Sequence, residues 1–251
     1  MNIITYDSDH IEDSLLIDME IFKSIKNFRL QCTMDESVDV IIERLNLQIF
    51  YKFVLDFNCG NNLPYHNLYH LKSMLLNCYE GSWYSKIDYT DIRGLCVGAL
   101  FCDFNHSGGK LDDYHNIKSA LKGLEIANKY ANSELTGLSV YEYEIAESAI
   151  KITEYPYKNV PLSITDRIIR DADLMLIYEE DVFVLFSQYC GLKSEIEITL
   201  NKSISYNDFS LIFKKFWNEV CNWNSEWALE KAKFRNLEML KSNIIKIFSD
   251  L

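Results

Sequence analysis

The sequence predicts an all-α fold, a compact bundle of many helices. Apolar residues recur every three or four positions along most of the chain, which is the spacing of one face of an α-helix. The period-two alternation of a half-buried strand extends over a useful length only at 194–200. No internal repeat, low-complexity segment or Pro/Gly/Ser-rich linker interrupts the pattern, so we expect a single domain over residues 1–251.

The first predicted helix begins at Thr33-Met34-Asp35-Glu36, which has the spacing of a capping box. One buried face then runs along this helix, made of Val38, Ile41, Ile42, Leu45, Ile49 and Phe53.

A second helix is expected to begin near Pro64, a residue tolerated in a first turn, with Asn61 or Asn62 as its N-cap. In such a helix, His66 and His70 would lie one turn apart on the same face.

The third predicted helix starts at Thr90-Asp91 and is apolar on nearly every side, which indicates a helix inside the core. The polar segment Cys102–His106 ends it, and Gly108-Gly109 breaks the chain. Later helices are predicted at 112–132, 140–152, 164–180, 181–190, 206–222 and 225–249.

Charge and cysteine content exclude several classes of protein. The 37 acidic residues outnumber the 25 basic ones, and the resulting net charge of −12 repels the phosphates of long nucleic acids. A small nucleotide held by metal ions is still compatible with this charge. The seven cysteines are an odd number with no C-x-x-C pair, which favours reduced thiols. No apolar run approaches the roughly 20 residues that span a bilayer, so we expect a cytoplasmic protein with no membrane partner.

Histidine and aspartate gather in three short segments of otherwise apolar helical sequence. The segments are Tyr65–His70, Cys102–His106 and Asp171–Leu174. Three of the five histidines of the chain fall in the first two segments. Asp103 and Asp173 both follow apolar helical residues, where a buried carboxylate is costly unless a cation neutralises it. The sequence therefore predicts a divalent-metal site built from several helices.

These segments resemble the motifs of the HD-superfamily metal-dependent phosphohydrolases, and within that superfamily the 3′,5′-cyclic nucleotide phosphodiesterases. Tyr65-His66-Asn67 followed by His70 matches the opening motif of that family. Cys102-Asp103 with His106 is similar to its His-Asp motif, and Ala172-Asp173-Leu174 to its late Ala-Asp-Leu. The motif core covers about residues 60–180 of this chain.

The resemblance implies a role for each residue. His70, Asp103 and Asp173 would be metal ligands, with Asp103 bridging two divalent ions, Zn²⁺, Mn²⁺ or Mg²⁺. His66 would be the general acid, and His106 would orient the water or the phosphate. The implied reaction is hydrolysis of a small cyclic nucleotide or cyclic oligonucleotide to a linear product.

Two residues depart from the family pattern. Cys102 stands where the family has a metal-ligating histidine, and either its thiolate replaces that ligand or the thiol is a small buried hydrophobe. Asn105 replaces an aspartate, which removes one carboxylate near the ligands. The alternatives are therefore a degenerate nucleotide-binding protein, a phosphohydrolase acting on dNTPs or another phosphomonoester, and a structural helical protein with coincidental motifs. The sequence leaves the oligomeric state open.

Several other residues have simpler explanations. Asp171 is expected to form hydrogen bonds beside Asp173, and His115 to be a solvated residue in a first helical turn. The late aromatic residues are at helical spacing and are expected in the core, namely Phe209, Phe213, Phe216, Trp217, Trp223 and Trp227.

Overall fold

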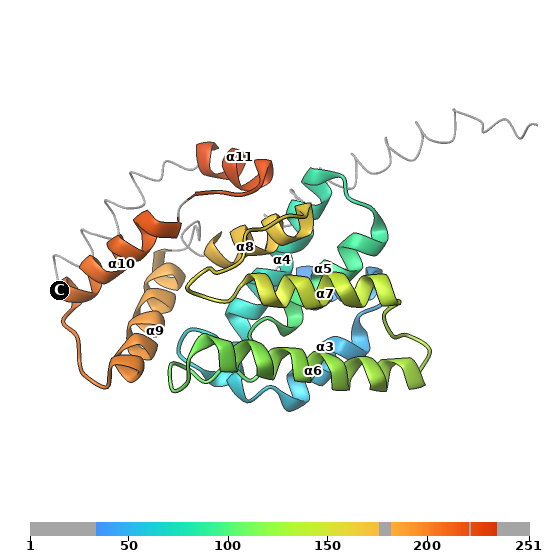
Figure 1. The fold of residues 1–251 in the computed structure, drawn as a ribbon, viewed down its shortest axis with the longest axis horizontal. Coiled ribbons are helices and arrows are strands. Elements are labelled where there is room, and N and C mark those ends of the chain that lie inside the picture. The colour runs from blue at the N-terminus through green and yellow to red at the C-terminus, as the bar shows by residue number, and fades with distance from the viewer. Residues whose placement is uncertain (1–33, 176–181, 221, 235–251) are drawn as a thin grey trace, which may run out of the picture.

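A computed structural model describes residues 34–175, 182–220 and 222–234 of the chain. Within these ranges the protein is all-α, as the sequence predicts, and contains no strand (Figure 1). The elements in order are α2 (Met34–Arg44), α3 (Gln48–Phe57), the 3₁₀ turn η1 (Cys59–Asn62), α4 (Leu68–Ser85), α5 (Tyr89–Phe101), α6 (Asp113–Ser133), α7 (Val140–Ile152), α8 (Ile164–Leu174), α9 (Val182–Leu200), α10 (Tyr206–Val220) and α11 (Glu226–Phe234).

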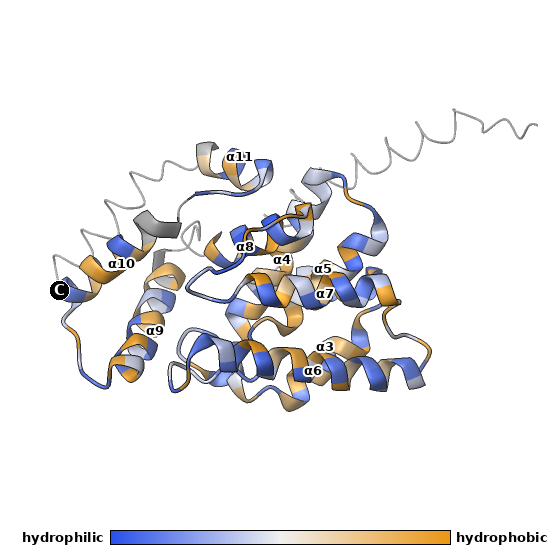
Figure 2. Cartoon of the chain, in the orientation of Figure 1, coloured by the Kyte–Doolittle hydropathy of each residue, from blue (hydrophilic) through white to orange (hydrophobic). Residues whose placement is uncertain are grey.

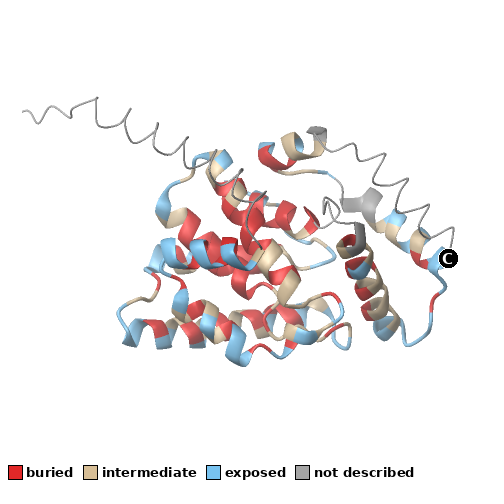
Figure 3. Cartoon of the chain, turned by 180° about the vertical axis from the view of Figure 1, so that it is seen from behind, coloured by how far each residue is buried: buried red, intermediate tan, exposed pale blue. Residues whose placement is uncertain are grey.

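The helices α4 and α5 form the centre of the molecule. Every residue of α5 from Ile92 to Phe101 is buried, so this helix is covered on all sides. It packs against α7, α4 and α3, while α8 and α11 lie over α4. Figure 3 shows the buried residues concentrated in these central helices. Outer helices such as α6 instead alternate buried and exposed residues, and Figure 2 shows the matching alternation of hydrophobic and hydrophilic residues.

Two buried clusters stabilise this arrangement by removing apolar surface from water. The larger one joins α2 to α7 and includes Phe50 and Phe101, whose rings meet edge to face at 6.4 Å between centroids. The other lies among α4, α5, α7, α8 and α11 and includes Met74, Ile168 and Trp227. A small third cluster joins α9 to α10.

The predicted first helix is divided in two. The chain turns at Leu45–Leu47, where Asn46 adopts a positive φ of 53°, and α3 starts afresh at Gln48. Arg93, which is buried, donates from Nε to the Leu45 carbonyl at 3.1 Å. The turn is thus held by a residue distant in sequence, whereas the apolar spacing continues through it. Thr33 of the predicted capping box lies outside the described residues.

The alternating segment 194–200 is helical, because it is the last part of α9. Side chains one turn apart interact here, as in the Lys193–Glu197 ion pair at 2.6 Å and the bond from the Thr199 hydroxyl to the Glu195 carbonyl.

Most of the other predicted helices are observed close to their expected bounds, but the one expected at 181–190 is observed as α9, which continues to Leu200. Those at 112–132 and 140–152 correspond to α6 and α7, and the helix at 206–222 to α10. The predicted helix at 164–180 is observed as α8 up to Leu174, and the one at 225–249 as α11 up to Phe234, and residues 176–181 and 235–251 lie outside the described residues.

Five of the seven cysteines belong to the described residues, while Cys32 and Cys221 lie outside them. Cys59, Cys78, Cys96, Cys102 and Cys190 are all free thiols. None of the described helices combines the length and apolar character needed to cross a membrane.

The closest approach between helices occurs where glycines of α5 meet α7. A Cβ atom added at Gly98 would lie 2.6 Å from the Ala149 Cβ, and one added at Gly94 would lie 2.8 Å from the Glu142 carbonyl oxygen. Real Cβ atoms do not come that close to other heavy atoms, so the absence of side chains at these two positions lets α5 and α7 pack together.

We predict that Gly98→Val destabilises the protein by about 1–3 kcal/mol, because α5 and α7 must separate to admit the side chain. Urea denaturation followed by circular dichroism measures this change. Glu144→Ala, on the exposed side of α7, is the control and should change stability by less than about 0.5 kcal/mol. Equal stability of Gly98→Val and the wild type would contradict the close packing.

Candidate functional site

The histidine and aspartate segments of the sequence meet in space at one side of the central helices. His70 lies in the first turn of α4, and the Asn67 side chain caps that helix by accepting from the backbone N–H groups of Tyr69 and His70. Asp103 lies in the turn directly after α5, and Asp173 near the end of α8. Two helices and the turn after a third therefore contribute one side chain each.

His70 is the buried centre of this group. Its Nε2 atom lies 3.3 Å from Asp103 Oδ2 and 3.3 Å from Asp173 Oδ1. The residue is 2 % exposed, and Nε2 makes no hydrogen bond of acceptable geometry with any described residue. A buried polar atom without a partner costs free energy, so Nε2 is suited to a ligand that the protein itself does not supply.

The charges around His70 favour a bound cation. Burial lowers the pKa of His70, but Asp103 and Asp173 raise it more strongly, to about 10. Burial raises the pKa of Asp103, but His66 and His70 outweigh it and hold that pKa well below its usual range. One imidazole nitrogen and two carboxylate oxygens are also a donor set that divalent metal ions accept. The residues present therefore fit the predicted ion.

Cys102 directly precedes Asp103 but lies in a different environment. Its thiol is 4 % exposed and belongs to the apolar cluster of Met74 and Ile168. The Sγ atom lies 3.3 Å from the Ala99 carbonyl oxygen and 3.9 Å from Asp103 Oδ2. Burial raises the pKa of the thiol well above its usual value, and the Asp103 carboxylate raises it further. Without a metal ion, Cys102 is thus a neutral buried thiol beside the site.

His66 does not lie on a helix, which corrects the sequence interpretation. The helix begins at Leu68 rather than near Pro64, and His66 belongs to the turn before it, where the Asn67 N–H donates to the Tyr65 carbonyl at 2.8 Å. The cause is Glu195 of α9, whose Oε1 accepts from the backbone N–H groups of Tyr65 at 2.7 Å and His66 at 3.1 Å. His66 still lies beside His70, with 5.7 Å between ring centroids.

The same glutamate orients the His66 ring. Glu195 Oε2 lies 2.6 Å from His66 Nδ1, so Nδ1–H donates to the carboxylate and Nε2 is directed elsewhere. Burial lowers the pKa of His66, but Asp103 and Glu195 raise it more, to a net value above the usual one. The Gly191 backbone makes this possible, because a Cβ there would lie 2.1 Å from the Pro64 carbonyl oxygen and push α9 away.

His106 stacks on His66 but has the opposite preference for a proton. The two ring centroids are 3.6 Å apart and the rings are inclined by 29°. Burial and the neighbouring His66 lower the pKa of His106 to about 4. Its Nδ1 accepts from the Gly108 backbone N–H at 3.1 Å, so the neutral ring carries its proton on Nε2, 4.0 Å from Asp113 Oδ1.

Asn105 has a structural role that its sequence position did not reveal. It adopts a positive φ of 57°, which asparagine tolerates better than most residues. Its Oδ1 accepts from the Cys59 backbone N–H, and its own N–H donates to Asn58 Oδ1, both at 2.8 Å. These bonds fasten the turn that carries Asp103 to the turn before His66.

Two further expectations are confirmed. Asp171 is fully buried and accepts hydrogen bonds from the backbone and side chains of Asn224 and Ser225. His115 is exposed and pairs with Asp112, the N-cap of α6. Of the late aromatic residues, Phe209 and Trp227 are buried and Phe213 and Phe216 partly buried, while the side chain of Trp217 is not described.

Sequence analysis missed Glu195 and Asp113. Glu195 lies 129 residues from His66 and belongs to no motif. The only available signal was an acidic residue within an otherwise half-apolar helix. The position of Asp113 beside His106 could not be recognised from sequence, because acidic residues are usual in the first turn of a helix.

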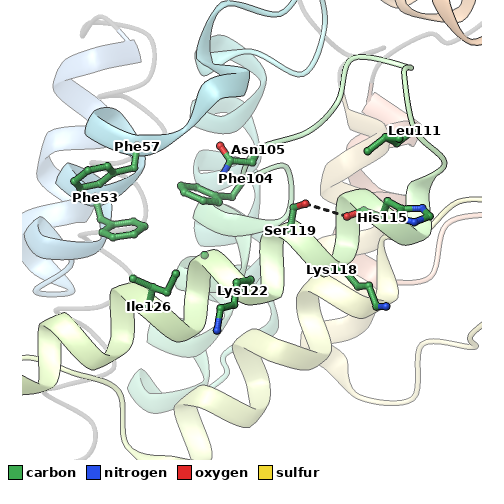
Figure 4. Close-up of a pocket in the computed structure, with 11 residues that line it drawn as sticks. Phe53, Phe57, Phe104, Asn105, Leu111, His115, Lys118, Ser119, Lys122 and Ile126 are labelled. Atoms are coloured by element: carbon green, nitrogen blue, oxygen red, sulfur yellow. Dashed lines mark hydrogen bonds between the residues drawn. The ribbon is translucent and has the colours of Figure 1, made fainter.

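A surface groove of about 660 Å³ lies between α3 and α6, and Asn105 and His115 are among the residues that line it (Figure 4). Phe53, Phe57 and Phe104 line one part of it and Lys118 and Lys122 another. Both lysines already have partners, since Lys122 pairs with Glu125 and Lys118 lies over the Tyr114 ring. The groove contains none of the predicted ligands, so its size does not make it the functional site.

Comparison with known proteins adds no relative to this description. No protein-family model matches the sequence, and no curated protein is significantly similar to it. The chemistry of the site is therefore the basis for assigning a function.

Proposed function

We propose that this chain is a metal-dependent phosphodiesterase of the HD superfamily that opens a small cyclic nucleotide or cyclic oligonucleotide. The observation that carries the proposal is the buried Nε2 of His70, which lies 3.3 Å from each of two carboxylate oxygens and makes no hydrogen bond of acceptable geometry with a described residue. Burying such a group is costly unless a cation belongs there. The three residues are those that the resemblance names as ligands.

His70, Asp103 and Asp173 would hold the metal. Bound divalent ions would supply activation of a water molecule and neutralisation of phosphate charge. This chemistry matters in a protein of net charge −12, because a phosphodiester would otherwise be repelled.

The residues around the metal ligands divide the proton chemistry between them. His66 holds a proton on Nε2 while Glu195 binds its Nδ1–H, so Nε2 donates to the departing ribose oxygen. His106 is neutral and presents Nε2–H, which donates a hydrogen bond to a phosphate oxygen without adding a second positive charge beside His66. One imidazole thus acts as the acid and the other as a neutral donor.

A second candidate function is nucleotide binding without turnover. The observation that favours it is Cys102, which stands at a ligand position of the family but is a buried neutral thiol in an apolar cluster. If that thiol does not bind metal, one ion is held by fewer ligands, and the pocket retains a nucleotide without hydrolysing it.

Mass spectrometry of reaction products tests the proposal. Chelator-treated protein is resupplied separately with Mg²⁺, Mn²⁺ or Zn²⁺ and incubated with cyclic mononucleotides, cyclic oligonucleotides and dNTPs. We expect linear products from one class of cyclic substrate, and a loss of at least about 100-fold in Asp103→Ala because the metal loses a ligand. His115→Ala, which removes an exposed histidine outside the site, should retain full activity.

The other outcomes separate the alternatives. Retention of one nucleotide with no product under any metal would indicate the binding protein. Hydrolysis of dNTPs, with cyclic substrates refused, would indicate a phosphomonoesterase or nucleotide phosphohydrolase. Neither hydrolysis nor retention, with no effect of chelation on melting temperature, would contradict a functional site altogether.

A second prediction concerns pH. Activity should fall as pH rises through the raised pKa of His66, because the acid then loses its proton. Glu195→Gln removes a carboxylate that raises this pKa, so the alkaline limb of the kcat profile should move to lower pH. An unchanged limb in Glu195→Gln, measured with saturating Mg²⁺ and the substrate identified above, would show that His66 is not the acid.

A further inference from the structure

We propose that His66, His106 and Glu195 form an additional binding site for Zn²⁺, separate from the His70 centre. Each of the three residues offers one ligand atom, and these atoms all lie within 4.8 Å of one another. Among the described residues, these three side chains form a cluster whose ligand atoms are close enough to share one metal ion. It does not include His70, Asp103 or Asp173.

The geometry converges on one carboxylate oxygen. Glu195 Oε2 lies 2.6 Å from His66 Nδ1 and 3.9 Å from His106 Nδ1. Both Nδ1 atoms face this carboxylate. The side chains of Glu195 and His106 are nearly buried, and that of His66 is 21 % exposed. The ion would replace the hydrogen bond between His66 and Glu195, and one side of the site stays accessible to solvent.

The donor set selects the metal. Two imidazole nitrogens and one carboxylate oxygen are a common ligand set of Zn²⁺, which accepts a water molecule as its fourth ligand. Mg²⁺ prefers six oxygen ligands and Mn²⁺ also favours oxygen, so neither should compete well here. Each imidazole binds through an unprotonated nitrogen, so the ion replaces the His66 proton, which is released to solvent. His106 must also give up the hydrogen bond from Gly108.

A functional consequence follows if the proposed function is correct. Zn²⁺ bound at Nδ1 would displace the Nδ1 proton of His66 and turn the imidazolium into a metal-bound imidazole, whose remaining Nε2–H is a weaker acid, so an excess of Zn²⁺ would inhibit hydrolysis supported by Mg²⁺ or Mn²⁺. This consequence rests on the proposed function, whereas the binding site itself does not.

Zn²⁺ binding by the full-length chain tests the site without an activity assay. The double variant His70→Ala/Asp173→Asn removes two ligands of the predicted centre. In equilibrium dialysis with Zn²⁺ alone, we expect this double variant to bind one more Zn²⁺ ion than the triple variant that also carries His106→Ala. Adding Glu195→Gln to the double variant nearly preserves the shape of the side chain and should lower the affinity for that ion at least tenfold. Adding His115→Ala should leave the affinity unchanged. Circular dichroism confirms that each variant is folded.

Cobalt identifies the ligands directly. Co²⁺ bound to the double variant should give weak d–d absorption without a thiolate-to-cobalt charge-transfer band, since the site contains no cysteine. An unchanged Zn²⁺ count in both His106→Ala and Glu195→Gln, or a thiolate band, would overturn the site. A Zn²⁺ ion lost with His106→Ala in a chain that hydrolyses nothing would uphold this site while rejecting the proposed function. Hydrolysis with no such ion would reject this site alone.

Discussion

The structure depends on how a buried imidazole is neutralised. His70 lies inside the molecule with its Nε2 between the carboxylates of Asp103 and Asp173, and no group of the described chain satisfies it. In a low-dielectric interior, two carboxylates and an imidazole are stable together only when a positive charge is shared among them, either a proton or a metal ion. These groups come from α4, from the turn after α5 and from α8, so the packing of the three helices determines how close the charges lie. Gly94 and Gly98 let α5 pack against α7, and this packing helps to position the turn that carries Asp103.

Glu195 is the second constraint, and it joins α9 to the site. One carboxylate oxygen satisfies two backbone N–H groups that would otherwise be unpaired, while the other fixes the His66 ring. The backbone bonds hold the turn before α4 in place, where His66 stacks on His106. Because the stacked rings cannot both be charged at low cost, His66 holds the proton and His106 is neutral. The two histidines thus differ in charge although they touch.

Helices with a regular apolar face were predictable from sequence, as α6 and α7 demonstrate, since local periodicity alone determines which residues are buried. The proximity of His70 and Asp103 was predictable because polar residues in apolar segments require an explanation. The break at Asn46 and the late start of α4 were not, because each is set by a partner distant in sequence, Arg93 and Glu195 respectively. The hydrogen bond from the Asn105 backbone N–H to Asn58 Oδ1 could not be predicted either, because the two residues are distant in sequence. The sequence singles out Cys102, but the apolar surroundings of its thiol depend on how α4 and α5 pack.

The central claim is that a divalent ion binds between His70, Asp103 and Asp173. Anomalous X-ray diffraction from crystals grown with Mn²⁺, recorded on both sides of the manganese absorption edge, tests it most directly. The account predicts a manganese peak in contact with His70 Nε2 and with a carboxylate oxygen of each aspartate, and loss of that peak in His70→Ala. A fully occupied manganese peak elsewhere, with His70 Nε2 bonded only to a carboxylate through its own proton, would contradict it.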